Sequence, residues 1–242
     1  MEHLPTGQRR SHDPPRASRL GRGRIVAVER DEEAIAAWKD EVWPQVKAPR
    51  RTCASCVCFE DEAGQGLRPP KGRTWAPRGV RPVARVRGQG AGRVNVAGVV
   101  CFRPGRRAHL FYALHVCRGR RGEAKSFSWR RYRDLIIATH EHLGAPLVWC
   151  WDNLNLHLVR ELDDFAAANA AWLRVFRLPT YAPELNPAEG VWSLLRRAMA
   201  NFVVTDLDGL VRIVKRKLKK IQFRPHLLDG HLAAAGLSID PW

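Results

Sequence analysis

The order of short apolar runs is the feature that most constrains the fold of this chain. Two runs rich in β-branched and aromatic residues, 94–102 and 109–116, are separated by Arg-Pro-Gly-Arg-Arg, a turn signal, and a strand over 53–59 precedes them. These three are typical of an antiparallel meander. Further along, strands expected over 147–151 and 172–178 alternate with helical patterns over 128–143, 155–169 and 187–202. This alternation favours parallel strands with crossover helices, so the sequence predicts an α/β fold with a mixed sheet flanked by helices.

Segments of different character flank this pattern. Residues 1–28 are rich in Pro, Arg, Gly and Ser and lack apolar periodicity, so we expect a basic disordered arm. An amphipathic helix is predicted from Glu29 to Trp43, with Pro44 ending it, and a last helix over 207–221 has one apolar and one cationic face. The expected organisation is the arm, a linker helix within 29–50, a main domain over 51–225 and a C-terminal tail over 226–242.

Two shorter signals complete the expected elements. Thr74-Trp75 starts a further strand candidate. Gly88 to Gly92 lacks the Gly-Lys-Ser/Thr ending of a phosphate-binding loop, so we expect a flexible hairpin connection there.

The charge balance indicates a polyanionic partner. Lys and Arg number 41 against 24 Asp and Glu, which gives a net charge of +17. Cations cluster over 103–107, 118–121 and 130–133, where Trp129 and Tyr132 are interleaved for stacking, although solvated surface charge is the alternative. No apolar run reaches the roughly 18 residues of a membrane span, and no secretory signal follows Arg9-Arg10, so an intracellular protein is expected.

The six cysteines are too sparse for a disulfide scaffold in a chain of this length. Cys53-x-x-Cys56 has the spacing of a half zinc site, but no second Cys or His pair completes a tetrahedral set. We therefore expect cysteines that are buried in strands as small apolar residues.

Three carboxylates lie at the ends of well-separated segments. Asp61 and Asp152 each close an apolar run, and Glu189 follows Asn186-Pro187, so strand ends could bring them together as a cage for divalent metal. Strand alternation places Asp61 on the face opposite Glu60. Each also has a structural alternative: Asp61 an acidic turn, Asp152 a cap or turn, and Glu189 the third position of a capping box begun by Asn186.

Taken together, these segments resemble a known family. Asp61-Glu62, Arg73 to Gly79, Asp152-Asn153 with His157, and the specific run from Leu178 to Glu189 with Trp192 are similar to mariner-like transposases, most closely the bacterial insertion-sequence branch. The resemblance runs from about Glu29 to Arg224 and implies a ribonuclease H-like catalytic domain.

The resemblance also implies site residues and cofactors. The acidic triad falls on Asp61, Asp152 and Glu189, which would hold two Mg²⁺ or Mn²⁺ ions for DNA cleavage and strand transfer. Further candidates support the triad or contact DNA: Asn153, His157, Arg78, Lys215, Arg216 and Lys219. Helix capping for Asn153 and a surface position for His157 are the alternatives.

Members of that family carry helix-turn-helix segments ahead of the catalytic domain. The 28 residues before Glu29 are too few and too polar for such a module, so we expect an N-terminally truncated transposase. Two functions follow: a metal-dependent catalytic domain acting on transposon ends and target DNA, or a non-catalytic DNA-binding or dimerising remnant that interferes with an intact relative. A homodimer, a cytoplasmic and nucleoid-associated location in a bacterium, and no membrane partner are the remaining expectations.

Overall fold

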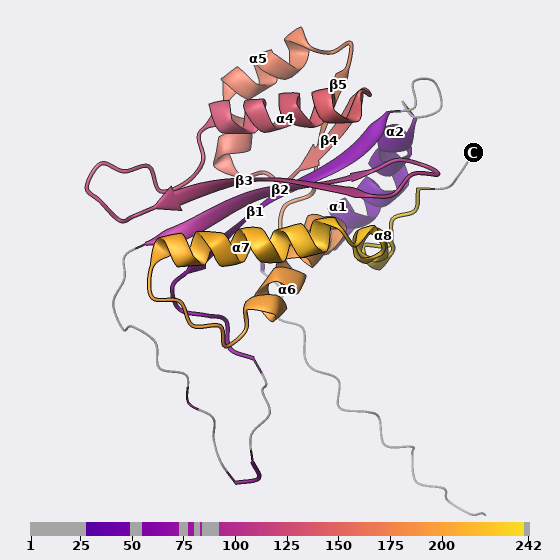
Figure 1. Ribbon diagram of the computed structural model, residues 1–242. Helices are drawn as coiled ribbons and strands as arrows, with labels where there is room; N and C mark the ends of the chain where they lie inside the picture. The colour runs from indigo at the N-terminus through magenta and orange to yellow at the C-terminus, as the bar shows by residue number, and fades with distance from the viewer. Residues whose placement is uncertain (1–27, 49–54, 73–76, 80–82, 84–91, 240–242) are drawn as a thin grey trace, which may run out of the picture.

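The computed structural model describes residues 28–48, 55–72, 77–79, 83 and 92–239, and its centre is one five-stranded mixed sheet (Figure 1). The strands follow the order β3-β2-β1-β4-β5. Strand β2 is antiparallel to β1 and β3, whereas β4 and β5 run parallel to β1. Their bounds are β1 Cys56–Gly66, β2 Arg93–Phe102, β3 His109–Cys117, β4 Leu147–Trp151 and β5 Leu173–Arg177. The predicted meander and the predicted parallel strands are both confirmed.

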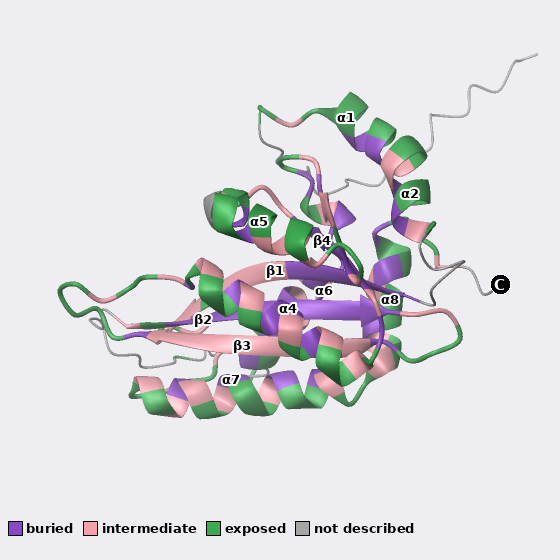
Figure 2. Ribbon diagram, turned by 90° about the horizontal axis from the view of Figure 1, so that it is seen from above, coloured by how far each residue is buried: buried purple, intermediate pink, exposed green. Residues whose placement is uncertain are grey.

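Helices cover both faces of the sheet. One face carries α4 (Trp129–Leu143) and α5 (Arg160–Ala168), and the other carries α6 (Ala188–Met199), α7 (Leu207–Gln222) and α8 (Pro225–Ala234) (Figure 1). Successive side chains of β1 contribute to the apolar cores on both faces of the sheet, because Cys56 and Cys58 pack towards α4 while Val57 and Phe59 pack towards α6 and α7. Helix α7 packs on the sheet through a buried apolar stripe and exposes its cationic side (Figure 2). The mixed sheet flanked by helices is therefore as predicted.

Three predicted elements differ from the structure. Strand β1 does not end at Phe59 but continues to Gly66, because its ladder with β2 extends to the pair Gly66–Arg93. The helix predicted over 155–169 is a 3-10 turn, Asn155–Leu158, followed by α5, since Val159 between them is extended. Pro44 does not end the first helix.

The first helical segment has three parts: α1 (Glu32–Ala37), a π-helical turn (Trp38–Val42) and α2 (Trp43–Lys47). Pro44 lies in the first turn of α2, where its missing N–H group leaves no gap in the helix. Trp38 and Trp43 are buried in the core that α6 and α7 share. The segment expected as a linker helix is thus packed against the sheet.

The segment expected as a tail also packs. In α8, Leu228 and Leu232 are buried in that same core, and Ala235 and Leu237 extend the contact. The five described cysteines, Cys56, Cys58, Cys101, Cys117 and Cys150, are buried and free, as predicted. The arm before residue 28, Cys53, the strand candidate at Thr74 and the Gly-rich stretch 88–91 lie outside the described residues. In the described part, no helix has the length and apolar character needed to cross a membrane.

Candidate active site at the divergence of two strands

The two aspartates lie where β1 and β4 part. The parallel pairing of these strands covers Cys56–Phe59 against Leu147–Cys150, and β4 then ends at Trp151 while β1 continues beside β2. Asp152 is the first residue after β4, and Asp61 lies two residues beyond the last β1–β4 pair. The prediction that Asp61 ends a strand is wrong, since it lies inside β1, yet it still reaches the sheet edge at which β4 stops.

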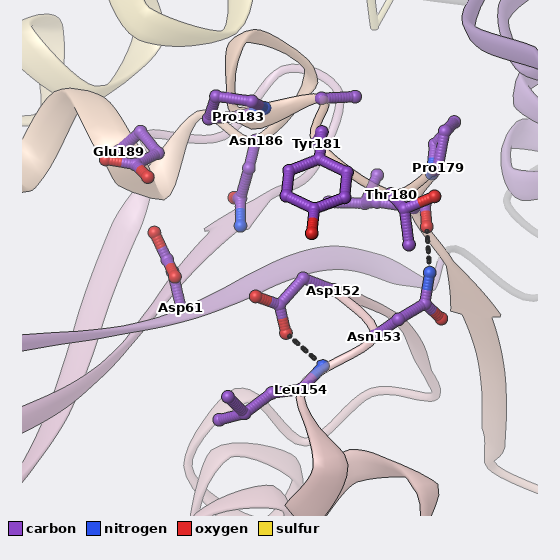
Figure 3. A pocket seen from close by; sticks show the side chains of 12 residues that line it. Asp61, Asp152, Asn153, Leu154, Pro179, Thr180, Tyr181, Pro183, Asn186 and Glu189 are labelled. Carbon is purple, nitrogen blue, oxygen red and sulfur yellow. Dashed lines mark hydrogen bonds between the residues drawn. The ribbon is translucent and has the colours of Figure 1, made fainter. Parts of the chain in front are cut away.

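Glu189 lies in the first turn of α6, but the capping box that was its structural alternative does not form. The N–H of Asn186 donates to the Pro183 carbonyl (3.1 Å), so the Glu189 carboxylate is not its partner. The Asn186 side chain accepts from the N–H of Ala188 (3.1 Å) and donates from Nδ2 to the Glu60 carbonyl (2.9 Å). Asn186 thereby fastens α6 to β1, and the Glu189 carboxylate faces the aspartates instead (Figure 3).

Asp61 is a carboxylate in an environment that opposes its charge. Burial, followed by the charge of Glu189, raises its pKa to about 7, against hydrogen bonds that favour the ionised form. These bonds come from the backbone N–H of Glu62 to Oδ1 (2.8 Å) and from the indole N–H of Trp192 to Oδ2 (2.9 Å). No cation of the described residues forms an ion pair with Asp61.

Asp152 is held by its own turn. Its Oδ1 accepts from the N–H of Leu154 (3.0 Å) and lies 2.9 Å from Nδ1 of His157. Burial opposes ionisation of Asp152, but these hydrogen bonds outweigh it and hold the pKa below its ordinary value. The other oxygen points towards Asp61 (Figure 3). The turn interpretation and the site interpretation of Asp152 are therefore compatible, because they use different oxygens.

His157 and Glu60 form a buried support beneath Asp152. The His157 side chain is 1% exposed, so the alternative of a surface position is wrong, and the ring stacks on Trp151 with centroids 4.5 Å apart. Nε2 lies 3.2 Å from Oε2 of Glu60, whose pKa burial and the charge of Asp61 raise well above the ordinary value. Glu60 was not a sequence candidate. Strand alternation placed it correctly on the face away from Asp61, and nothing in the sequence paired it with His157.

Tyr132 has a different place from the predicted one. It is fully buried, and its hydroxyl donates to Oε2 of Glu62 (2.7 Å), so it cannot offer a ring to DNA. Ser126 donates to the same carboxylate at 3.0 Å. Trp129 instead holds the guanidinium groups of Arg130 and Arg133 over its ring, at 4.7 and 5.5 Å from the centroid. Of the two predicted stacking residues, Trp129 alone remains a surface candidate.

Among the described residues, two cavities border the aspartates. One of about 360 Å³ is lined by Asp61, Asp152 and Glu189 together with the loop from Leu178 to Pro183 (Figure 3). The other, of about 410 Å³, lies on the β1 side and includes Glu62, Ser126 and Arg93. Arg93 lies over Gly64 because glycine leaves room for the guanidinium there. A second cation, Arg196, lies 4.0 Å from Glu189.

The remaining sequence candidates divide between the site and the surface. Asn153 lines the first cavity and donates from Nδ2 to the Leu178 carbonyl (2.9 Å), a bond that ties the loop after β4 to the end of β5 rather than capping a helix. Arg78, Lys215, Arg216 and Lys219 are exposed and line neither cavity.

The donor set has the chemistry of a site for hard cations. Asp61, Asp152 and Glu189 contribute only carboxylate oxygens; the charges of Glu189 and Asp152 raise the pKa of Asp61, and the charge of Asp152 raises that of Glu189. Within the described residues, no three His, Cys, Asp or Glu side chains converge tightly enough to enclose one ion. The carboxylates thus border one open cavity and interact electrostatically in pairs.

Comparison with known proteins adds the family context. Residues 56–210 match the family model described as DDE superfamily endonuclease. Among solved structures, the chain is similar to the "Mos1 transposase paired-end complex with left transposon end" and to the "Mos1 mariner paired end complex with Mn". Each of these two is 15% identical with a TM-score of 0.56, and the alignment covers 93% of this chain and 69% of the other.

A third structure, the "mariner Mos1 paired end complex with Mg", is 16% identical with a TM-score of 0.54, and 93% of this chain and 68% of that one align. These likenesses establish a shared fold, so the ribonuclease H-like fold is confirmed. No curated protein sequence matches the chain.

Proposed function

Because this chain belongs to the DDE superfamily of endonucleases, we propose that it is a transposase catalytic domain that cuts and joins DNA strands using divalent metal ions. The observation that carries the proposal is the meeting of Asp61, Asp152 and Glu189 on one cavity. They come from a strand, a strand end and a helix start that are far apart in the sequence. Acids that repel one another around a cavity are stabilised by bound cations, and DNA is the anionic substrate that a basic chain attracts.

We propose that Asp61, Asp152 and Glu189 hold two Mg²⁺ or Mn²⁺ ions. Such ions activate the attacking water or 3′-hydroxyl and stabilise the leaving oxygen. The protein's own contribution is orientation. The turn at Leu154 and the His157 ring fix one oxygen of Asp152, and Trp192 and the Glu62 N–H fix both oxygens of Asp61. These contacts leave the carboxylates in a defined arrangement before DNA arrives.

The cations around the cavity give the DNA backbone a position. Arg93 at the rim of the second cavity and Arg196 beside Glu189 are placed to contact phosphates next to the cut strand. The exposed cations of α7, Lys215, Arg216 and Lys219, would hold more distant phosphates. We further propose the bacterial insertion-sequence branch, a cytoplasmic and nucleoid-associated location, and a dimer that pairs transposon ends.

The test is cleavage of supercoiled plasmid in Mg²⁺ or Mn²⁺ by the wild-type chain and by Asp152→Asn. The matched control is Asp164→Asn, which removes an exposed carboxylate on α5. We expect metal-dependent nicking by the wild type and by the control, and a loss of at least about a thousandfold in Asp152→Asn, since removing a group that acts as part of a unit removes most of the catalysis. Equal nicking by all three proteins would mean a contaminant. DNA binding without nicking by any of them would support a non-catalytic remnant.

A further inference from the structure

Tyr181 adopts a backbone conformation that its side chain opposes. Its φ is 55°, in the left-handed region where a side chain clashes with the backbone and where glycine is the usual residue. The ring is 55% exposed, so burial does not compensate for the strain. An aromatic residue that is strained and exposed adds little to folding. Such residues are held at ligand-binding and catalytic sites, where the side chain acts on a ligand.

The N-terminal segment holds this loop in place. Arg30, whose side chain is 5% exposed, donates from Nη1 to the Tyr181 carbonyl and to Oε2 of Glu184, both at 2.9 Å, and its Nη2 pairs with the other Glu184 oxygen. Pro179 and Pro183 restrict φ on either side of Tyr181. The left-handed turn is therefore fixed by contacts on both sides, and the ring has a defined position before any ligand binds.

That position is the mouth of the active-site cavity. Tyr181 lines the cavity of about 360 Å³ that contains Asp61, Asp152 and Glu189, and its ring extends towards Asp152 (Figure 3). Leu154, 39% exposed, lies on the other side of Asp152. The hydroxyl end of the Tyr181 ring and an aliphatic side chain thus flank the carboxylate (Figure 3). A cavity of about 360 Å³ lies in the range of pockets that take one small ligand, so it has room for a single nucleotide.

We propose that Tyr181 is a stacking platform for an unpaired base next to the phosphate that is cut. The inference rests on the proposed function, since it places a DNA strand in this cavity. Every base has a π face, so an aromatic ring binds an unpaired base whatever its identity. Stacking is also uncharged, so Tyr181 holds the nucleotide beside acids that repel its phosphate. Tyr181 therefore makes cleavage faster where the bases at the cut are already unpaired.

The experiment compares two duplexes that differ only at the cut: one is fully paired, and one has two unpaired nucleotides there. The wild type, Tyr181→Phe, Tyr181→Leu and Tyr181→Gly are assayed for kcat and KM in Mn²⁺, and for quenching of 2-aminopurine at the unpaired position. Quenching is measured in the Asp152→Asn background. We expect wild type and Tyr181→Phe to prefer the unpaired duplex in kcat/KM and to quench. Tyr181→Gly and Tyr181→Leu should lose about tenfold or more of that preference and most of the quenching.

The outcomes separate this inference from the proposed function. If Tyr181→Gly keeps the preference and the quenching, the platform is refuted while nicking by the wild type still supports the nuclease. Retention of both by Tyr181→Leu would mean aliphatic contact with the sugar and would also refute stacking. If no protein nicks, the proposed function fails, and quenching that depends on Tyr181 would alone support the platform. Thermal melting excludes misfolding, because Tyr181→Gly relieves the strain and should melt no lower than the wild type.

Discussion

Gly98→Ala should impair the active site without changing any charged or polar group. Gly98 is the β2 partner of Asp61 in the ladder with β1, and the outer ring of Trp192 lies against it. A Cβ at this position would lie 2.5 Å from Cη2 and 3.0 Å from Cζ2 of Trp192. Carbon atoms pack at about 3.5–4.0 Å, so the indole has to move by about 1 Å. That movement stretches the bond of 2.9 Å between its N–H and Oδ2 of Asp61.

The magnitude follows from two contributions. Overpacking of a filled core costs about 1–3 kcal/mol, and loss of a hydrogen bond to a charged group costs about 1.5–3 kcal/mol. The two costs do not add in full, because the movement of the indole that breaks its hydrogen bond to Asp61 also relieves part of the clash. We therefore expect a loss of about 2–4 kcal/mol in the free energy of unfolding, measured in urea. A catalytic group displaced by about 1 Å loses about a hundredfold in rate, so Mn²⁺-dependent nicking should fall by that order.

A double mutant separates the clash from the hydrogen bond. Cη2 and Cζ2 belong to the indole's six-membered ring, which Phe does not reproduce, so Gly98→Ala should cost less stability in Trp192→Phe than in the wild type. Nicking should stay low in Trp192→Phe both with and without Gly98→Ala, because neither of these proteins has the indole N–H. Gly66→Ala is the matched control on β1, where a new Cβ meets only the Gly92 carbonyl at 3.9 Å. If Gly98→Ala is destabilised yet nicks at the wild-type rate, Trp192 does not position Asp61.

Three further predictions use other parts of the structure. The pKa of Asp61 is raised from 3.8 to about 7, so between these pH values the folded state keeps a proton that the unfolded state has released. The free energy of unfolding without metal, measured in urea, should therefore fall by at most about 4 kcal/mol from pH 4 to pH 7, and by less in Asp61→Asn. In the same titrations, Mg²⁺ should stabilise the protein more at pH 8 than at pH 5.5. Tyr132→Phe should destabilise by about 1–3 kcal/mol, because the Glu62 carboxylate loses a buried donor while Ser126 stays; a change below about 0.5 kcal/mol would contradict the bond. Replacing three α7 cations, Lys215, Arg216 and Lys219, by Glu should weaken binding of any duplex and make the slope of log K against log salt shallower by about three. An unchanged slope would show that α7 does not contact the DNA.

Apolar periodicity was sufficient to predict the sheet and most of its helices. The β-branched runs became β2 and β3, and the alternating second half became β4, α5 and β5. The errors lie where pairing or packing overrides local composition. The stretch from Glu60 to Gly66 is too polar to read as a strand, but hydrogen bonds to β2 hold it in one. Pro44 looked like a helix end, yet a π turn before it lets the helix restart.

The site was predictable only in part, for a related reason. Asp61, Asp152 and Glu189 stand out because each occurs near the end of an apolar or specific run. Tyr181 and Arg30 meet across 151 positions, and no local pattern in the sequence indicates that contact. Glu60 likewise gains its partner His157 only when β1 and β4 lie side by side. Residues that support a site are harder to predict than residues that form it, because their role exists only in the folded contacts.

The capping pattern around Glu189 shows why a local explanation and a functional one can coincide in the sequence and separate in the structure. Asn186 caps the start of α6 without help from Glu189, since its side-chain oxygen accepts from the N–H of Ala188 and its amide nitrogen donates to β1. Glu189 is therefore free to face the cavity, where burial and the charge of Asp152 raise its pKa. This arrangement costs stability when no metal is bound, because the acids are held near one another and Arg196 is 4.0 Å from Glu189 alone. Bound Mg²⁺ would relieve this repulsion. The free energy that the repulsion costs the metal-free fold is therefore regained on binding and adds to the affinity for the metal.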